Sequence, residues 1–236
     1  MSLPLVIAQD DFYRDRSGGG CVADNGLCPE WIVDNLDRYK DPFLEHVYIS
    51  VIPIALGFAI AVTLGLIAHR RRGLIGPLAG LTGAIYTIPS PAMLLLLLPV
   101  TGRGNVTAIV ALTAYTQVII FRNVITGLQG VPSEMVDAAA GMGMTSRQRL
   151  FKVEIPLALP EILAGLRIAA ATTVGLAAFA YLAGAGGLGR EIDLQIEFKS
   201  NVVVAGLLVT LLAAALDLLV LLVQRALTPW RRAATA

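Results

Sequence analysis

The sequence predicts an all-α integral membrane protein with five transmembrane helices. Of its 236 residues, 56% are hydrophobic and only 15% are charged, and the mean hydropathy is +0.72, so the chain is far more apolar than a soluble domain. The apolar residues form five stretches near 46–68, 77–100, 106–125, 161–183 and 200–223. Each has about the twenty residues that a helix needs to cross the bilayer. The alternating segments of a transmembrane β-barrel are not found, and the net charge of +1 does not indicate a nucleic-acid partner.

The distribution of basic residues predicts the orientation, because Lys and Arg beside short loops tend to stay in the cytoplasm. They are concentrated after the first span, around the third connection and in the C-terminal tail, at His69, Arg70, Arg71, Arg72, Arg122, Arg147, Arg149, Lys152, Arg225, Arg231 and Arg232. The intervening loops carry only Arg103, Arg190 and Lys199. We therefore expect the N-terminus outside and the C-terminus inside. Residues 1–45 form an extracytoplasmic segment, 46–225 a transmembrane domain with a cytoplasmic loop at 126–160, and 226–236 a cytoplasmic tail.

The N-terminal segment is polar and acidic, and its short apolar opening lacks the basic start of a cleaved signal peptide. Its outside location would allow Cys21 and Cys28 to form a disulfide, with two free thiols as the alternative. Between Pro29 and Tyr39, apolar residues recur near helical spacing. This pattern predicts a short interfacial helix on the outer membrane surface, and an ordinary polar loop is equally open.

No motif for catalysis or for a resident cofactor is found. The chain lacks a P-loop, so a nucleotide that drives it must bind another subunit. Gly184, Gly186 and Gly189 spell G-x-G-x-x-G, but they follow a predicted transmembrane helix and not a strand, which favours a tight, mobile external turn. His46 and His69 stand at opposite ends of the first span, so no metal site is expected.

Two features inside the spans call for partners or a pathway. An unpaired Asp near the bilayer centre costs about 2.5–3.5 kcal/mol, so we expect Asp217 to pair with Arg167 or Arg122. Such a pair clamps helices more often than it conducts, and Asp217 could instead be hydrated near the interface. In the second span, proline removes backbone donors and bends a helix. The bend would lie beside the translocation path or gate, or be purely structural, at Pro89, Ser90 and Pro91.

The loop between the third and fourth spans is too polar to cross the membrane and too patterned to be disordered. Ser133 after Pro132 is a suitable N-cap. Acidic residues in the first turns favour a helix that begins there, and Gly141 and Gly143 can end it. A second short basic helix is expected over about 146–153, stopping at Pro156.

The same loop resembles that of the binding-protein-dependent ABC importer permeases, which carry an E-A-A, then G, then I-x-L-P signature. Asp137-Ala138-Ala139 stands for E-A-A, Gly143 for the glycine and Val153-Glu154-Ile155-Pro156 for I-x-L-P. The resemblance continues after about residue 43 through HVYISVIPIALGFAIAVTLGL, YTIPSPAMLLLLLP, GLRIAAATTVG and AGAGGLG, and leaves residues 1–42 uncovered. It is strongest to permeases of the osmoprotectant subgroup, which import glycine betaine, carnitine or choline.

The resemblance implies a type I (MetI-like) importer permease in the cell inner membrane. The chain would not be an enzyme, because a cytoplasmic ABC ATPase dimer would hold ATP and Mg. An external binding protein would deliver substrate, and a second copy or a homologous permease would complete the path. Docking of the ATPase falls on Glu134, Asp137, Ala138, Ala139, Gly141, Gly143 and Pro156. The rivals are a methionine-type amino-acid permease, a gradient-driven secondary carrier and a membrane scaffold without transport activity.

Overall fold

The computed structural model describes Cys21 and residues 25–230, which are helical nearly throughout. Before the first long helix come α2 (Pro29–Asp34) and the 3-10 turn η1 (Leu36–Tyr39). The helices of the first half are α3 (Lys40–Arg70), η2 (Arg72–Leu74), α4 (Ile75–Thr87), α5 (Ser90–Thr101) and α6 (Asn105–Gln129). Those of the second half are α7 (Ser133–Gly141), α8 (Ser146–Arg149), the π turn η3 (Leu150–Glu154), α9 (Ile155–Ala177), η4 (Ala180–Ala183), α10 (Leu188–Leu194) and α11 (Lys199–Leu227).

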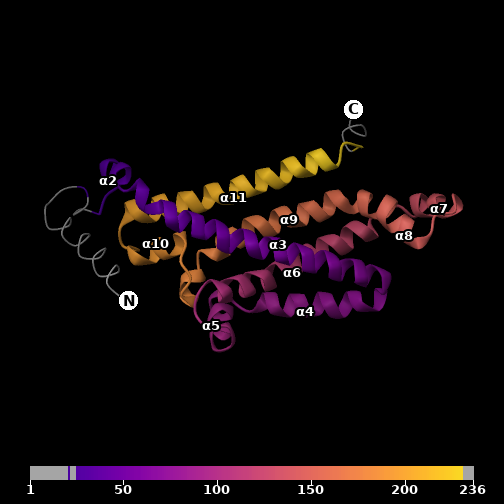
Figure 1. Ribbon diagram of the computed structural model, residues 1–236, viewed down its shortest axis with the longest axis horizontal. Helices are drawn as coiled ribbons and strands as arrows, with labels where there is room; N and C mark the ends of the chain where they lie inside the picture. The colour runs from indigo at the N-terminus through magenta and orange to yellow at the C-terminus, as the bar shows by residue number, and fades with distance from the viewer. Residues whose placement is uncertain (1–20, 22–24, 231–236) are drawn as a thin grey trace.

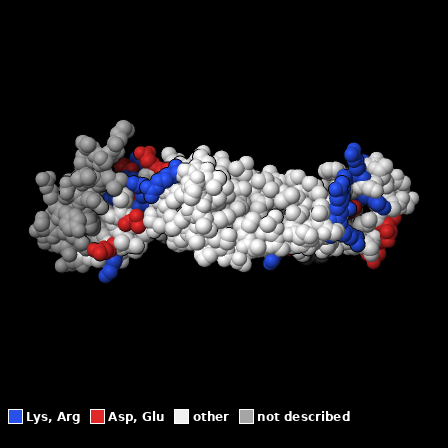
Figure 2. Space-filling view, turned by 90° about the horizontal axis from the view of Figure 1, so that it is seen from below, with Lys and Arg blue, Asp and Glu red and all other residues white. Residues whose placement is uncertain are grey.

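The long helices run along the long axis of the molecule, as Figure 1 shows. Helices α2 and α10 lie at one end, and α7 and α8 lie at the other. On the face drawn in Figure 2, the charged side chains gather at the two ends and leave an almost uncharged band between them. This distribution matches a bundle whose middle lies in hydrocarbon.

The second predicted span is not one continuous helix. Helices α4 and α5 meet at an angle of 99° across a break of two residues, so four helices are long and apolar enough to cross a membrane, or five spans if the bent pair counts as one. Pro89 and Pro91 remove the donors that would bond to the carbonyls of Ile85 and Thr87. Ile88, which precedes Pro89, is extended with ψ 126, as expected before proline. The bend is therefore much sharper than a kink.

Helix α6 is the core of the bundle and packs against both α3 and α9. It is the most buried of the candidate spans, whereas α11 is the most exposed. Small residues bring the backbones together: a Cβ at Gly65 of α3 would lie 2.4 Å from Val124 Cγ1, and a Cβ at Gly165 of α9 would lie 2.4 Å from Asn123 Cβ. Neither position has room for a side chain.

The fourth span begins earlier than the sequence predicted. The expected helix over 146–153 does not stop at Pro156, because α8, η3 and α9 follow one another as one helical segment over 146–177. Pro156 is the second residue of α9 and lies within this continuous segment. The π turn precedes it, with the N–H of Ile155 bonded to the carbonyl of Leu150, five residues earlier. The wider turn carries the helix into the proline.

Candidate functional site

The predicted coupling loop contains a short exposed helix, α7, at the end of the molecule opposite α2 (Figure 1). Ser133 is not its N-cap: Ser133 is already helical, Pro132 holds the cap position, and the carbonyl of Pro132 accepts the first bond from the N–H of Met135. Glu134 lies in the first turn and is exposed, where a negative charge favours the helix dipole. The helix therefore starts without a side-chain cap.

The C-terminus of α7 ends in a Schellman motif built on Gly143. The N–H of Gly143 bonds to the carbonyl of Ala140 at 2.9 Å, and the N–H of Met144 bonds to the carbonyl of Ala139 at 3.1 Å. Gly143 has φ +79, a left-handed conformation that glycine adopts at little cost. Thr145 and Gln148 then form a capping box that starts α8. The two helices are thus joined by a compact turn of defined shape.

The residues assigned to ATPase docking do not all share one exposed face. Glu134, Asp137, Ala138 and Gly141 are exposed, and so are the flexible side chains of Met135 and Met142. Ala139 is only 1% exposed, so it spaces α7 against the rest of the loop and is not offered to a partner. Pro156 is half-buried within the helical segment 146–177 and is part of the span.

A hydrogen bond that the sequence did not predict joins this loop to α3. His69 Nε2 lies 2.6 Å from Glu154 Oε2, which joins the last turn of α3 to η3. Glu154 is the variable position of the I-x-L-P signature. The two residues are 85 positions apart, so only the packing of the helices brings them together.

The two candidate partners of Asp217 lie in different places. Arg167 of α9 makes a bidentate pair with Asp217 of α11, with Nε to Oδ1 and Nη2 to Oδ2 both 2.8 Å. Arg122 is exposed on α6, beside Gly83 of α4. The pair therefore ties α9 to α11, and two parallel bonds make this geometry specific.

The break between α4 and α5 is closed by an aromatic residue of the core helix. The Tyr115 hydroxyl donates to the carbonyl of Ile88, and the Tyr115 ring packs edge-to-face on Tyr86 at 5.8 Å between centroids. Of the three proposed path residues, Pro89 is exposed while Ser90 and Pro91 are half-buried. Tyr115 of α6 thus satisfies the carbonyl of Ile88 within the break, while the carbonyl of Ile85 accepts from the N–H of Ile88 at 3.2 Å.

A glutamate in the N-terminal part of α3 holds the glycine-rich loop that follows α9. Glu45 accepts bonds from the N–H groups of Gly186 and Gly187 at 3.3 and 3.2 Å, and from Asn105 Nδ2 at 3.1 Å. A Cβ at Gly186 would lie 1.9 Å from Glu45 Oε2, so glycine is required for this close approach. The turn is tight, as expected, but two bonds hold it to one carboxylate, which also accepts from Asn105. The sequence offered only an acidic residue at the start of an apolar run.

The described residues just before α3 pack on α10 and α11. Arg38 Nε lies 2.7 Å from Glu191 Oε2 of α10, and the Tyr39 hydroxyl donates to Asn201 Oδ1 of α11 at 2.6 Å. Asn201 in turn donates to the carbonyl of Glu191 at 2.7 Å. The region 29–39, expected as one short helix, is divided into α2 and η1 and leads directly into α3.

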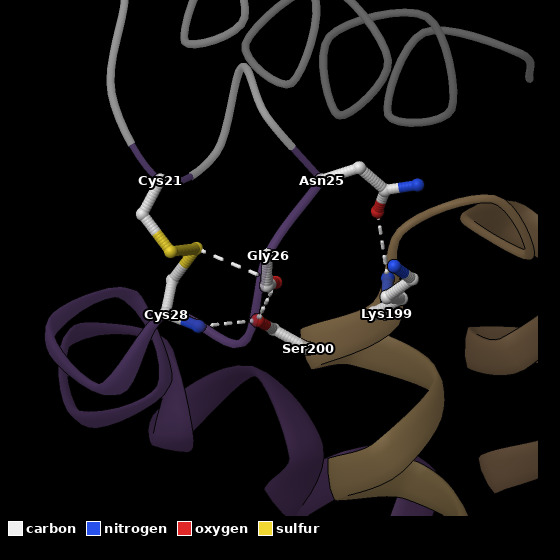
Figure 3. The surroundings of a disulfide bond; sticks show 6 residues. All are labelled: Cys21, Asn25, Gly26, Cys28, Lys199 and Ser200. Atoms are coloured by element: carbon white, nitrogen blue, oxygen red, sulfur yellow. Dashed lines mark hydrogen bonds between the residues drawn. A yellow bond between two sulfur atoms is a disulfide. The ribbon is translucent and has the colours of Figure 1, made fainter.

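A disulfide joins Cys21 to Cys28 and closes a loop that caps α11, as Figure 3 shows. The N–H of Cys28 donates to Ser200 Oγ at 2.8 Å, and Ser200 Oγ donates to the carbonyl of Gly26 at 3.0 Å. Asn25 Oδ1 accepts from the N–H of Lys199 at 3.0 Å. A free N–H of the first turn of α11 therefore receives its acceptor from a segment 174 residues earlier.

We expect the double substitution Cys21→Ser/Cys28→Ser to loosen this cap. A loop of this length contributes about 2.5 kcal/mol in the chain-entropy relation, so amide hydrogens in 25–39 and at the start of α11 should exchange faster. Ser200→Ala keeps the disulfide but removes the shared partner of Gly26 and Cys28, and should have a similar local effect of about 1–3 kcal/mol. Hydrogen exchange measures both. Unchanged exchange in the double variant would show that the disulfide does not hold the cap.

Comparisons with known proteins agree with this arrangement. Residues 53–233 match the family described as "Binding-protein-dependent transport system inner membrane component". The chain is 37% identical over 187 residues to a glycine betaine/carnitine/choline transport system permease protein of Bacillus subtilis (strain 168), covering 78% of this chain and 86% of the relative. It is 35% identical over 206 residues to an osmoprotectant import permease protein of Salmonella typhimurium, covering 84% and 96%.

Solved structures give the same architecture. An inward-facing structure of the MetNI methionine ABC transporter matches with a TM-score of 0.69 at 26% identity, covering 85% of this chain and all of that one. An amino acid ABC transporter matches with a TM-score of 0.65 at 18% identity, which is a likeness of fold alone. The sequence match includes the coupling loop and leaves the disulfide-bonded segment outside it.

Proposed function

Because the chain belongs to the family of binding-protein-dependent transport system inner membrane components, we propose that it forms the translocation path for an osmoprotectant such as glycine betaine, choline or carnitine. It is a permease subunit of an ATP-binding-cassette importer, resident in the inner membrane. The substrate class rests on one observation: relatives named for these compounds or for osmoprotectant import are 33–37% identical over most of the chain. The solved methionine transporter is less similar, at 26%.

We propose five spans with the N-terminus outside and the C-terminus inside. The bent pair of α4 and α5 supports this count, since it leads from the α3–α4 turn to Gly104, whose N–H bonds to the carbonyl of Ala183 beside α10 at 2.8 Å. The end that carries α7 also carries the arginine-rich turn after α3. By the preference of basic residues for the cytoplasm, that end faces inward.

The coupling proposed for this chain passes from α7 into the spans. The exposed face of α7 docks on a cytoplasmic ATPase dimer that holds ATP and Mg. Its compact Schellman turn leads into the helical segment 146–177, and the pair of Arg167 with Asp217 links that segment to α11. Motion of α7 would therefore move α9 and α11 together, as a rigid element that couples two discrete arrangements.

Two further partners are expected: a second permease chain and an extracytoplasmic binding protein. One chain with five spans is small for a gated path, so a second copy or a homologous permease is expected to complete it. A Cβ added at Gly175 of α9 or Gly206 of α11 would meet no neighbour, and such small residues allow helices of two chains to approach closely. An extracytoplasmic binding protein would deliver substrate at the end that carries α2 and α10.

The test is uptake by proteoliposomes that contain this chain, its ATPase and its binding protein. Labelled glycine betaine, choline, carnitine and methionine are compared with and without internal ATP, and an ionophore control removes ion gradients. We expect ATP-dependent accumulation of at least one of the three osmoprotectants and none of methionine. Methionine uptake alone would overturn the substrate class, and uptake that survives without ATP but fails with the ionophore would overturn the coupling.

A further inference from the structure

A groove lies where the inner end of α3 meets the start of the fourth span. It has a volume of about 390 Å³ and is open along one side. The wall from α3 is formed by Thr63, Leu66, Ile67 and Arg70, and the wall from α8 and η3 by Arg147, Leu150 and Phe151. The hydrogen bond between His69 and Glu154 joins the same two walls.

Each wall carries apolar residues and one arginine, and both arginines lie toward the same end, although the two helices run in opposite directions. The α3 residues recur at i, i+3, i+4 and i+7 and therefore share one helix face, with the basic residue last. The other wall recurs at i, i+3 and i+4, with the basic residue first. Because the two segments are antiparallel (Figure 1), Arg70 and Arg147 are each the residue of their wall nearest the end of the molecule that carries α7. The apolar part extends about 10 Å from Arg70 to Thr63 toward the middle of the bundle.

The exposure of the lining separates a water-facing end from a lipid-facing one. Arg70 and Arg147 are exposed, and within the described residues neither side chain makes a hydrogen bond or ion pair. The nearby carboxylate of Glu154 is already paired with His69. Ile67 and Phe151 are 44% and 61% exposed, and apart from the two arginines the groove has one polar lining residue, Thr63. The groove therefore combines two arginines without a side-chain partner and an exposed apolar surface, the apolar slot, formed by Leu66, Ile67, Leu150 and Phe151.

Along the long axis of the molecule, the arginines lie at the depth expected for lipid headgroups. Figure 2 shows Lys and Arg gathered between the uncharged band and the tip of the molecule at this end. In a bilayer, such a belt lies beside the phosphates of the cytoplasmic leaflet, which is rich in anionic lipid. Guanidinium groups suit this role because they bind phosphate oxygens with two donors each.

We propose that this groove binds an anionic phospholipid of the inner leaflet, with its phosphate between Arg70 and Arg147. One acyl chain lies along the apolar slot of Leu66, Ile67, Leu150 and Phe151. The site takes its orientation from the proposed function but does not depend on the substrate. The bound lipid fills the space between the first span and the root of the coupling loop, so it stabilises their contact beside His69 and Glu154.

The test places a reporter in the groove of the purified transporter complex. Phe151→Trp introduces an indole whose fluorescence is quenched by brominated acyl chains, and the difference from the parent protein isolates its signal. We expect brominated phosphatidylglycerol to bind about ten- to thirty-fold more tightly than brominated phosphatidylcholine, since two basic groups near an anionic surface contribute about 2 kcal/mol. Equal quenching by the two lipids would overturn the proposal.

Two pairs of substitutions make the test specific. Arg70→Gln/Arg147→Gln should reduce the preference for phosphatidylglycerol to about threefold or less, and Arg70→Lys/Arg147→Lys should restore part of it. Arg72→Gln/Lys152→Gln removes two charges from the same end of the molecule without touching the groove and should leave the preference unchanged. An unchanged preference in the first pair, or an equal loss in the control pair, would overturn the proposal. The readout needs no transport, so failed uptake would bear on the proposed function alone.

Discussion

Gly143→Val is expected to abolish ATP-dependent uptake while leaving the chain inserted in the membrane. Gly143 has φ +79 at the end of α7, a conformation that costs an L-residue about 1–2 kcal/mol and that a β-branched residue adopts least readily. The Schellman bonds to the carbonyls of Ala139 and Ala140 would be lost. The turn that joins α7 to the fourth span would then lose its shape, and uptake should fall by about tenfold or more.

Gly143→Asn is the matched control for this prediction. Asparagine tolerates positive φ better than other residues with a side chain, and a Cβ at Gly143 would meet no neighbour within 4 Å. We expect this variant to retain most of the uptake. The measurements are uptake in proteoliposomes and co-purification of the ATPase with each variant. If the valine and asparagine variants lose activity equally, the side chain blocks the docking surface and the backbone conformation is not the cause.

Asp217→Ala is expected to destabilise the folded chain by about 2.5–3.5 kcal/mol. The substitution leaves Arg167 without the carboxylate that accepts both of its bonds, and an unpaired arginine within a span costs about this much on insertion scales. Unfolding of the purified chain in mixed micelles with increasing SDS measures the change. A stability equal to that of the unsubstituted chain would show that water or lipid already solvates the arginine.

The double substitution Arg167→Met/Asp217→Leu separates stability from transport. Replacing both partners of an ion pair by apolar residues of similar volume is often neutral or stabilising, so this variant should recover the stability lost in Asp217→Ala. If it also transports, the pair is a helix clamp. If it folds but transports less than a tenth as fast as the unsubstituted chain, the pair acts in the transport cycle as the link between α9 and α11.

The family and the general function could be predicted from the sequence, because they depend on features that neighbouring residues determine. Apolar stretches of about twenty residues report the free energy of transfer into lipid, which is nearly additive along the chain. The spacing from Asp137 through Gly143 to Pro156 predicted a coupling loop and the resemblance to importer permeases, and the family match confirms the permease assignment. The turn at Gly143 was also readable, since glycine after a helical run often ends a helix.

The tertiary structure alone decided which distant groups meet. Arg167 and Arg122 both lie in the spans, but only the rotation of α9 against α11 points Arg167 at Asp217. Ala139 is in the docking signature yet faces inward, and Glu45 carries no signature yet holds the glycine-rich loop. Two prolines also have different effects: the helix bends by 99° at Pro89 but continues without a break through Pro156. Local sequence determines whether a segment forms a helix and can span the membrane, whereas the rotation, depth and register of the neighbouring helices determine which residues it contacts.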